Sequence, residues 1–108
     1  MTKKGIPESI KKQVEEIVNR FNSEVLQDPY DFYVTRYRVN YLYLGKKEAG
    51  VFYPVCRLKY TGEMSNWEFA IYKYSDERYD PDEWMFPGAE FLDGTIEGAL
   101  KAGLEAYP

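Results

Sequence analysis

The sequence predicts an α+β fold: an N-terminal helix, a three- or four-stranded antiparallel meander and a C-terminal helix, with both helices packed on one sheet face. Apolar residues recur at helical spacing near each end of the chain, and the middle alternates between two kinds of side chain. Polar turn formers separate the alternating segments. The length of 108 residues suits a single domain over residues 1–108, and an aromatic content of 18% favours a packed core over disorder.

The first helix is predicted from about Pro7 to Ser23. Proline is favourable at the first helical position because its missing N–H would have no partner there. One apolar stripe follows it, made of Ile10, Val14, Ile17, Val18 and Phe21. The helical region is expected to end before Pro29, since the residue that precedes a proline avoids the α conformation.

Three strands are predicted next, over about 32–44, 51–60 and 67–74. The segment 45–50 is expected to be a polar turn, and 61–66 supplies the turn of a central hairpin. A short fourth strand is expected near 90–92. The core face of the hairpin is predicted to carry Phe52, Cys56, Leu58, Tyr60, Trp67, Phe69 and Ile71.

Residues 75–94 are predicted to be a connecting loop, because prolines interrupt it at two places. Its segment 84–88, Trp-Met-Phe-Pro-Gly, is expected to fold back on the core, with an exposed contact patch as the alternative. The last helix is expected to begin after an N-cap at Asp93 or Thr95. Gly98 and Gly103 disfavour a helix, so we expect them to serve close packing against the sheet.

The composition excludes several kinds of active site. The chain has no histidine, so Ser-His-Asp and Cys-His catalysis are impossible, and its single cysteine cannot build a zinc site. Cys56 is expected to be a buried, unreactive thiol. The acidic segment 76–83 lacks the pattern of a calcium loop and is expected to be solvated. We therefore predict no catalytic residue, no metal and no cofactor, with carboxylate catalysis by the 76–83 segment as a minor alternative.

The charge is unevenly distributed along the chain. Residues 32–74 carry seven basic and three acidic side chains, whereas 75–108 carry two basic and nine acidic ones. Part of the basic charge falls on the predicted second face of the sheet together with several tyrosines. The candidate binding face consists of Arg36, Arg38, Tyr53, Arg57, Lys59, Tyr72 and Tyr74.

Three interpretations of this candidate face stay open. It would suit a protein partner or a homodimer, because tyrosine and arginine are enriched at interfaces. It would also suit single-stranded nucleic acid, which combines phosphate charges with stacking bases. The pI of about 4.9 and the presence of Glu68 on the same face weigh against nucleic acid. The third interpretation is a solvated face with cross-strand pairs.

The sequence also predicts where the protein works. No apolar run follows the basic residues at the N-terminus, and no segment has the roughly 18 apolar residues that span a bilayer. A lone cysteine fits a reducing compartment. We therefore expect a cytoplasmic protein without a membrane partner, with a non-catalytic interaction or accessory role.

Two strand motifs carry a resemblance. One strand ends in Cys56-Arg57-Leu58-Lys59-Tyr60, and the next begins with Trp67-Glu68-Phe69-Ala70-Ile71-Tyr72. With a helix before and after them, these motifs resemble a group of short uncharacterised prokaryotic proteins that share a domain of unknown function. The Pro87-Gly88 loop and the start of the last helix depart from that group. The resemblance implies no activity and transfers no catalytic residue.

Overall fold

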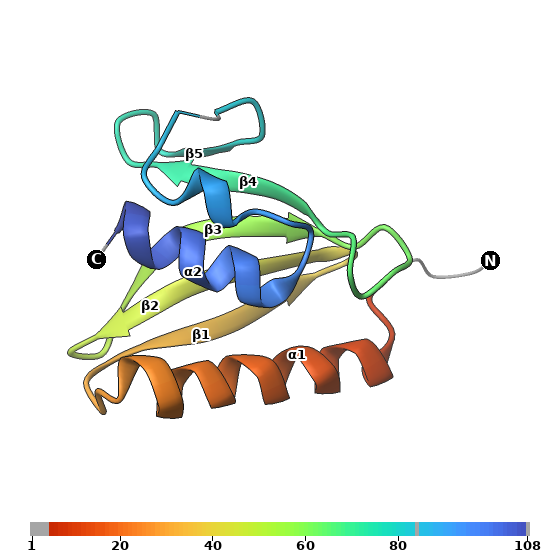
Figure 1. Cartoon of the computed structure of the whole chain (residues 1–108), viewed down its shortest axis with the longest axis horizontal. Helices are drawn as coiled ribbons and strands as arrows, with labels where there is room; N and C mark the ends of the chain where they lie inside the picture. Colours follow the sequence, from red (N-terminus) through yellow and green to blue (C-terminus); the bar gives the residue numbers. More distant parts are fainter. Residues whose placement is uncertain (1–4, 84, 108) are drawn as a thin grey trace.

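The computed structural model describes residues 5–83 and 85–107. A five-stranded antiparallel sheet has the order β1-β2-β3-β4-β5, and helices α1 and α2 lie against the same side of it (Figure 1). The elements are α1 (Glu8–Phe21), the π-turn η1 (Asn22–Leu26), β1 (Asp31–Arg38), β2 (Tyr41–Glu48), β3 (Val51–Lys59), β4 (Glu68–Lys73), β5 (Arg78–Asp80), the 3-10 turn η2 (Ala89–Phe91) and α2 (Ile96–Ala106). The predicted α+β class is confirmed. The number of strands is five rather than three or four.

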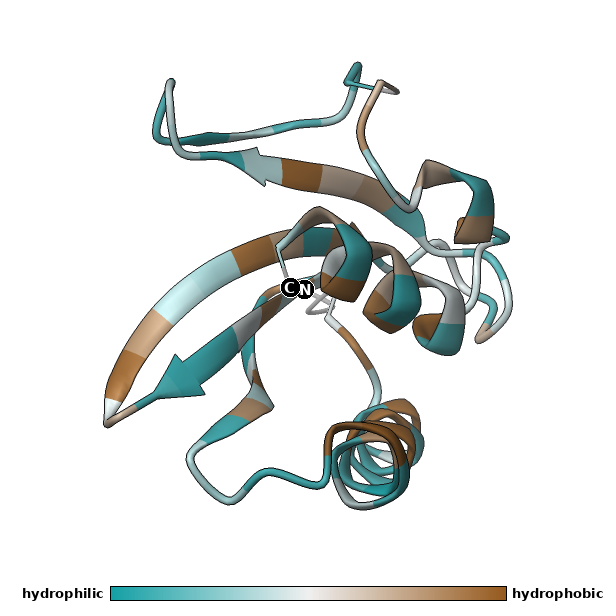
Figure 2. Cartoon of the chain, turned by 60° about the vertical axis from the view of Figure 1, so that its left-hand side comes forward, coloured by the Kyte–Doolittle hydropathy of each residue, from teal (hydrophilic) through white to brown (hydrophobic). Residues whose placement is uncertain are grey.

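The helices form where the apolar stripes predict them. Val14, Val18 and Phe21 of α1 are buried, and its apolar side faces the sheet and α2 (Figure 2). Helix α2 begins at the predicted cap, because the Thr95 hydroxyl accepts a hydrogen bond from the Gly98 N–H at 3.0 Å. In the described part of the chain, neither helix is long and apolar enough to cross a membrane.

The first predicted strand is in fact a hairpin. Arg38 pairs with Tyr41, so the chain reverses at Val39 and Asn40, where Val39 has a left-handed φ of 55°. The prediction missed this turn because valine is among the residues least suited to that conformation. The reversal places Tyr41 and Tyr43 on the sheet face opposite Tyr37. It also carries β2 through Glu48, so the polar turn predicted over 45–50 is confined to Ala49 and Gly50.

A bulge in β3 changes the predicted faces of the central hairpin. The register with β2 shifts between the pairs Leu44–Cys56 and Gly45–Pro54, which leaves Val55 as an extra residue. Both Val55 and Cys56 are therefore buried, at 2% and 0% exposure. Upstream of the bulge, Tyr53 pairs with Lys46 on the helix side of the sheet. The alternation expected over 51–60 holds only from Cys56 onward.

The core lies between the sheet and the two helices. Leu42, Leu44, Leu58 and Leu100 are at most 1% exposed. Tyr33 is buried among them, and its hydroxyl donates a hydrogen bond to the Leu100 carbonyl at 2.8 Å. Burial raises the pKa of the Tyr33 phenol well above its ordinary value, so the ring stays neutral.

A buried lysine lies at the border of this core. Lys46 is 3% exposed, and its Nζ lies 3.1 Å from Asp31 Oδ1 on the neighbouring strand. A buried cation needs such a partner, because removing the charge from water costs several kcal/mol. Lys46 lies within β2 and not in the polar turn that the sequence predicts.

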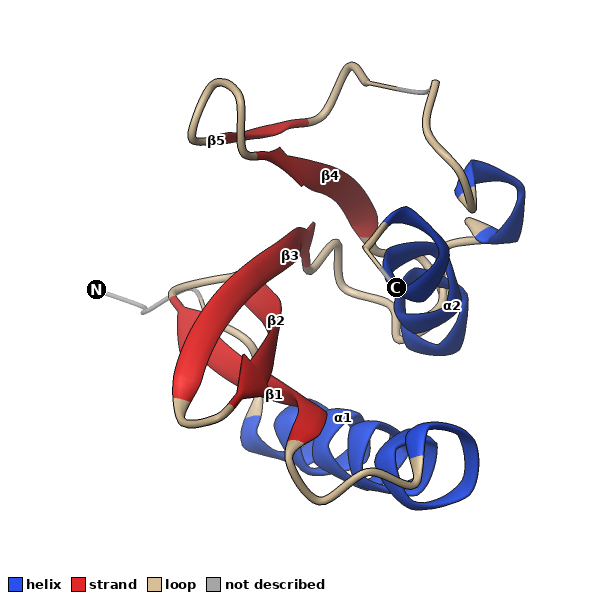
Figure 3. Cartoon of the chain, turned by 90° about the vertical axis from the view of Figure 1, so that its left-hand side faces the viewer, coloured by secondary structure: helices blue, strands red, loops and turns tan. Residues whose placement is uncertain are grey.

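Strands β3 and β4 separate toward one end of the sheet, as Figure 3 shows. They pair only between Cys56–Lys59 and Glu68–Ile71. Beyond this point Tyr74 occupies the space between them, with its hydroxyl donating to the Pro54 carbonyl at 2.7 Å. The Tyr107 hydroxyl at the end of α2 donates to the Tyr72 carbonyl. These tyrosines replace the missing strand pairing.

The segment 90–92 and the loop before it differ in part from the prediction. The expected short strand near 90–92 is wrong, because Ala89–Phe91 is a 3-10 turn. Phe86 folds back as predicted and stacks on Phe69 with ring centroids 5.8 Å apart. Met85 is 90% exposed. Trp84, which belongs to the same prediction, lies outside the described residues.

Candidate functional site

The side of the sheet opposite the helices, here called the open face, carries rows of residues set by the strand register. One row crosses the strands as Arg38, Tyr41, Lys59 and Glu68, and the next as Arg36, Tyr43, Arg57 and Ala70. Lys47 and Phe52 pair in a third row, and Tyr72 pairs with Tyr79 of β5. Because side chains alternate between the faces of a strand, these residues share one surface.

The open face is strongly basic although the chain is acidic. It carries five cations, Arg36, Arg38, Lys47, Arg57 and Lys59, against the single carboxylate of Glu68, which gives a local charge of +4. The whole chain has a net charge of −4. None of the ion pairs formed within residues 5–83 and 85–107 uses these five cations.

A layer of tyrosines packs at the centre of the open face. The Tyr79 ring meets Tyr43 edge-on at 5.3 Å and Tyr72 at 4.9 Å. Tyr43 and Tyr79 belong to β2 and β5, with two strands between them. Their rings can meet because one of those strands presents the small Ala70, which is only 3% exposed although it faces away from the helices.

Two arginines of the open face lie over aromatic rings. The Arg57 guanidinium is 4.7 Å from the Tyr41 ring centroid and 5.6 Å from that of Tyr79. Arg36 lies 3.8 Å over the Phe52 ring. Phe52 in turn lies across Gly45, where any Cβ would overlap its ring. Cation–π contacts of this kind hold the guanidinium groups in place while leaving their N–H donors free.

Two tyrosines in and beside the open face have shifted pKa values. Burial raises the pKa of Tyr79 to about 12, with the nearby Arg57 acting in the opposite direction. Burial also raises the pKa of Tyr74 to about 12. Both phenols are therefore neutral near pH 7, and the Tyr74 hydroxyl donates a hydrogen bond to the Pro54 carbonyl. The positive charge of the face is not diminished by tyrosinate.

Five of the seven residues of the candidate binding face lie on the open face as predicted. These are Arg36, Arg38, Arg57, Lys59 and Tyr72. Tyr53 is placed on the helix side by the β3 bulge and is 42% exposed at the end of the sheet. Tyr74 lies between β3 and β4, in edge-to-face contact with both Tyr72 and Tyr107. These two tyrosines border the open face rather than form it.

The prediction missed Tyr41, Tyr43, Lys47, Phe52 and Tyr79 of the open face. Because the turn at Val39 was not recognised, Tyr41 and Tyr43 were assigned to the opposite face of the sheet. Because 45–50 was expected to be a turn, Lys47 was not assigned to a strand. One signal could have found Phe52. A glycine inside a strand, here Gly45, indicates that a neighbouring group approaches the backbone closely.

The other chemical candidates in the sequence are occupied by structural contacts. Cys56 is fully buried, and burial raises the pKa of its thiol well above the ordinary value, which leaves it protonated and unreactive. In the acidic segment, Asp76, Asp80 and Glu83 surround Lys73 at 4.0, 3.7 and 3.1 Å. The described residues contain no cluster of three or more His, Cys, Asp or Glu suited to a metal ion.

Comparison of the chain with protein-family models, with curated proteins and with solved structures finds no match. The resemblance of the Cys56–Tyr60 and Trp67–Tyr72 motifs to a prokaryotic group therefore stays a prediction. The function has to be argued from the site itself.

Proposed function

We propose that the protein is a non-catalytic binding module whose open face docks on an acidic segment of a protein partner. The observation that carries this proposal is the set of five cations without an ion-pair partner among the described residues, held beside a single carboxylate. In a chain with a net charge of −4, so local an excess of positive charge requires an explanation. An acidic partner supplies the missing carboxylates.

The kinds of side chain on the open face support a protein partner. Arginine and tyrosine are enriched at the energetic centres of interfaces. Tyrosine offers a large contact area with only two rotatable bonds, and arginine binds carboxylates through a planar fork of N–H donors. Here Arg57 is already held between two rings. Little conformational entropy would be lost when its guanidinium binds a carboxylate.

The same charge disfavours a homodimer built by pairing two open faces. Each face would bring a charge of +4 against its copy, and like charges across an interface cost several kcal/mol. The outer edge of β1 is also protected. The Asn22 side chain accepts a hydrogen bond from the Tyr33 N–H at 2.8 Å and donates to its carbonyl at 2.9 Å. A second copy could not pair there without displacing Asn22.

Single-stranded nucleic acid is the second candidate, supported by cations that lie beside aromatic rings. Sequence-tolerant nucleic-acid binding requires ring faces on which bases can stack. On the open face the rings are half-buried against one another, and guanidinium groups cover those of Phe52 and Tyr41. This packing favours the acidic protein segment over the nucleic acid.

The test compares two fluorescently labelled probes with ten units each, a polyglutamate peptide and an oligothymidylate. Their binding is measured by fluorescence anisotropy at low and moderate salt. We expect polyglutamate to bind and its affinity to fall with salt. The variant Arg38→Glu/Lys59→Glu should weaken binding at least tenfold, since it reverses two exposed cations that make no aromatic contact. The matched control Lys12→Glu/Arg20→Glu makes the same charge change on the exposed side of α1 and should have little effect.

Two results would count against the proposal. Equal weakening by both double variants would mean that only net charge matters. Tighter binding of oligothymidylate than of an abasic strand of the same length would indicate base stacking and would favour nucleic acid, because stacking contributes about 1–3 kcal/mol per base.

A further inference from the structure

The outer edge of β4 is only partly covered. Strand β5 pairs with Ile71–Lys73 and ends at Asp80, before Pro81. At the other end, the Trp67 N–H points away from β3 and donates to the Gly94 carbonyl at 2.8 Å. Phe69 lies between these two attachments. Since backbone groups of a strand point to alternate edges, the Phe69 N–H and C=O face outward like those of Trp67.

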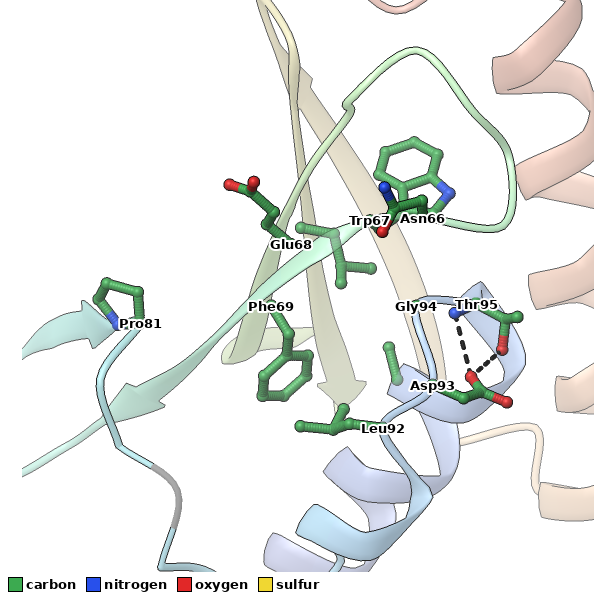
Figure 4. Close-up of a pocket in the computed structure, with 11 residues that line it drawn as sticks. Asn66, Trp67, Glu68, Phe69, Pro81, Leu92, Asp93, Gly94 and Thr95 are labelled. Carbon is green, nitrogen blue, oxygen red and sulfur yellow. Dashed lines mark hydrogen bonds between the residues drawn. The ribbon is translucent and has the colours of Figure 1, made fainter.

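A cavity of about 460 Å³ opens beside Phe69 (Figure 4). Four consecutive residues line it, from Asn66 to Phe69. Glu68 and Phe69 begin β4 and their side chains point to opposite faces, so the two residues line one cavity beside the backbone edge of the strand. No backbone hydrogen bond beyond the strand ladders of the described residues uses the Phe69 N–H or C=O. We call this gap between Gly94 and Asp80 the β4 notch.

The walls of the β4 notch are mainly apolar, and its polar rim is acidic. Leu58, Leu92 and Ala99 form the wall behind the strand, and Figure 4 shows Phe69 and Leu92 converging at one end. Among the described residues, the charged ones that line it are Glu68 and Asp93, without a lysine or arginine. Hydrogen bonds from Thr95 lower the pKa of Asp93, which keeps its carboxylate ionised.

We propose that the β4 notch binds an extended peptide segment that adds to the edge of β4. One residue of the peptide would exchange two backbone hydrogen bonds with Phe69. Its large apolar side chain would fill the cavity against Leu58 and Ala99, and basic residues on either side would face Glu68 and Asp93. Strand addition of this kind derives affinity from the backbone and specificity from a pocket for one side chain. The notch lies on the edge of β4 and shares Glu68 with the open face, whose five cations lie on β1, β2 and β3.

The test uses the acetylated, amidated tripeptide Lys-Leu-Lys, titrated into the isotope-labelled protein and followed by amide proton–nitrogen NMR. We expect shifts of the amides of Phe69, Gly94 and Ala99. Replacing the central leucine by alanine should weaken binding at least tenfold through lost apolar burial. N-methylation of the central leucine removes the hydrogen-bond donor and should weaken binding about fivefold.

A protein variant complements the peptide series. Ala99→Val adds bulk inside the cavity and should weaken binding, whereas Ala106→Val makes the same change at the far end of α2 and should not. If Ala99→Val does not fold, the N-methylated peptide still decides the question on the unchanged protein. Equal affinity of the methylated and unmethylated peptides, or shifts that map elsewhere, would overturn the proposal.

Discussion

Replacing Gly103 by alanine tests how closely α2 packs on the sheet. A Cβ at this position would lie 2.5 Å from Val55 Cγ1 and 2.7 Å from Tyr33 Oη. Both neighbours are only 2% exposed, so neither can move into solvent. Overpacking of this kind costs about 1–3 kcal/mol. Displacing the Tyr33 hydroxyl from the Leu100 carbonyl adds about 1 kcal/mol.

Helix propensity acts in the opposite direction. Alanine is about 1 kcal/mol more favourable than glycine within a helix. The balance is a loss of about 1–3 kcal/mol in the free energy of unfolding, measured by urea denaturation followed by circular dichroism. Adding Val55→Ala makes room, so the double variant should lose at least about 1 kcal/mol less than the sum of the single losses. A Gly103→Ala protein as stable as the parent, or more stable, would refute the close contact.

Three further predictions concern an edge, a turn and the pH dependence. Asn22→Ala should lower the free energy of unfolding by about 2 kcal/mol, because it removes both hydrogen bonds to the Tyr33 backbone. Asn22→Asp keeps only the acceptor, so its free energy of unfolding in urea denaturation should lie between those of the parent and of Asn22→Ala. Val39→Gly should raise stability by about 0.5–1 kcal/mol, because a left-handed valine costs about 1–2 kcal/mol and the greater freedom of unfolded glycine offsets part of the gain. Burial raises the pKa values of Tyr74 and Tyr79 to about 12 in the folded state. The stability that the two neutral phenols contribute should therefore be fully present below pH 10 and be lost as pH rises toward 12. A free energy of unfolding that does not change between pH 10 and 12 would contradict this.

The helices and the central hairpin could be predicted because local and global signals agree there. The apolar stripe of α1 has a regular helical spacing, and Thr95 is a strong N-cap. The segment 61–66 between β3 and β4 contains turn formers, and the strands on both sides are rich in aromatic residues. In these places most nearby residues favour the structure that forms, and Gly98 and Gly103 of α2 are the exceptions.

The β1–β2 hairpin could not be predicted because its turn contradicts local preference. Val39 adopts φ 55°, which valine rarely does, at the reversal between β1 and β2. If side chains are assumed to alternate along one continuous strand through this turn, Tyr41 and Tyr43 are assigned to the wrong face of the sheet. The β3 bulge left a clearer sign, since Pro54 cannot donate to a strand ladder and pairs with Gly45 at the register shift.

The candidate face was predictable in its charge and only partly in its shape. Arg36, Arg38, Arg57 and Lys59 alternate on their own strands, and this local pattern placed them correctly. The contact of Tyr79 with Tyr43 joins residues far apart in the sequence. It depends on the curvature of the sheet and on the small Ala70, which no local pattern predicts.

We propose that the five cations of the open face, which have no ion-pair partner within residues 5–83 and 85–107, form one surface for an acidic protein segment. The most direct measurement is an amide proton–nitrogen NMR map of the protein with the ten-residue polyglutamate at moderate salt. We predict shifts centred on Arg36, Arg57 and Lys59 that are absent in Arg38→Glu/Lys59→Glu and persist in Lys12→Glu/Arg20→Glu. Shifts centred on α1 or α2, or an unchanged spectrum at low salt, would contradict the claim.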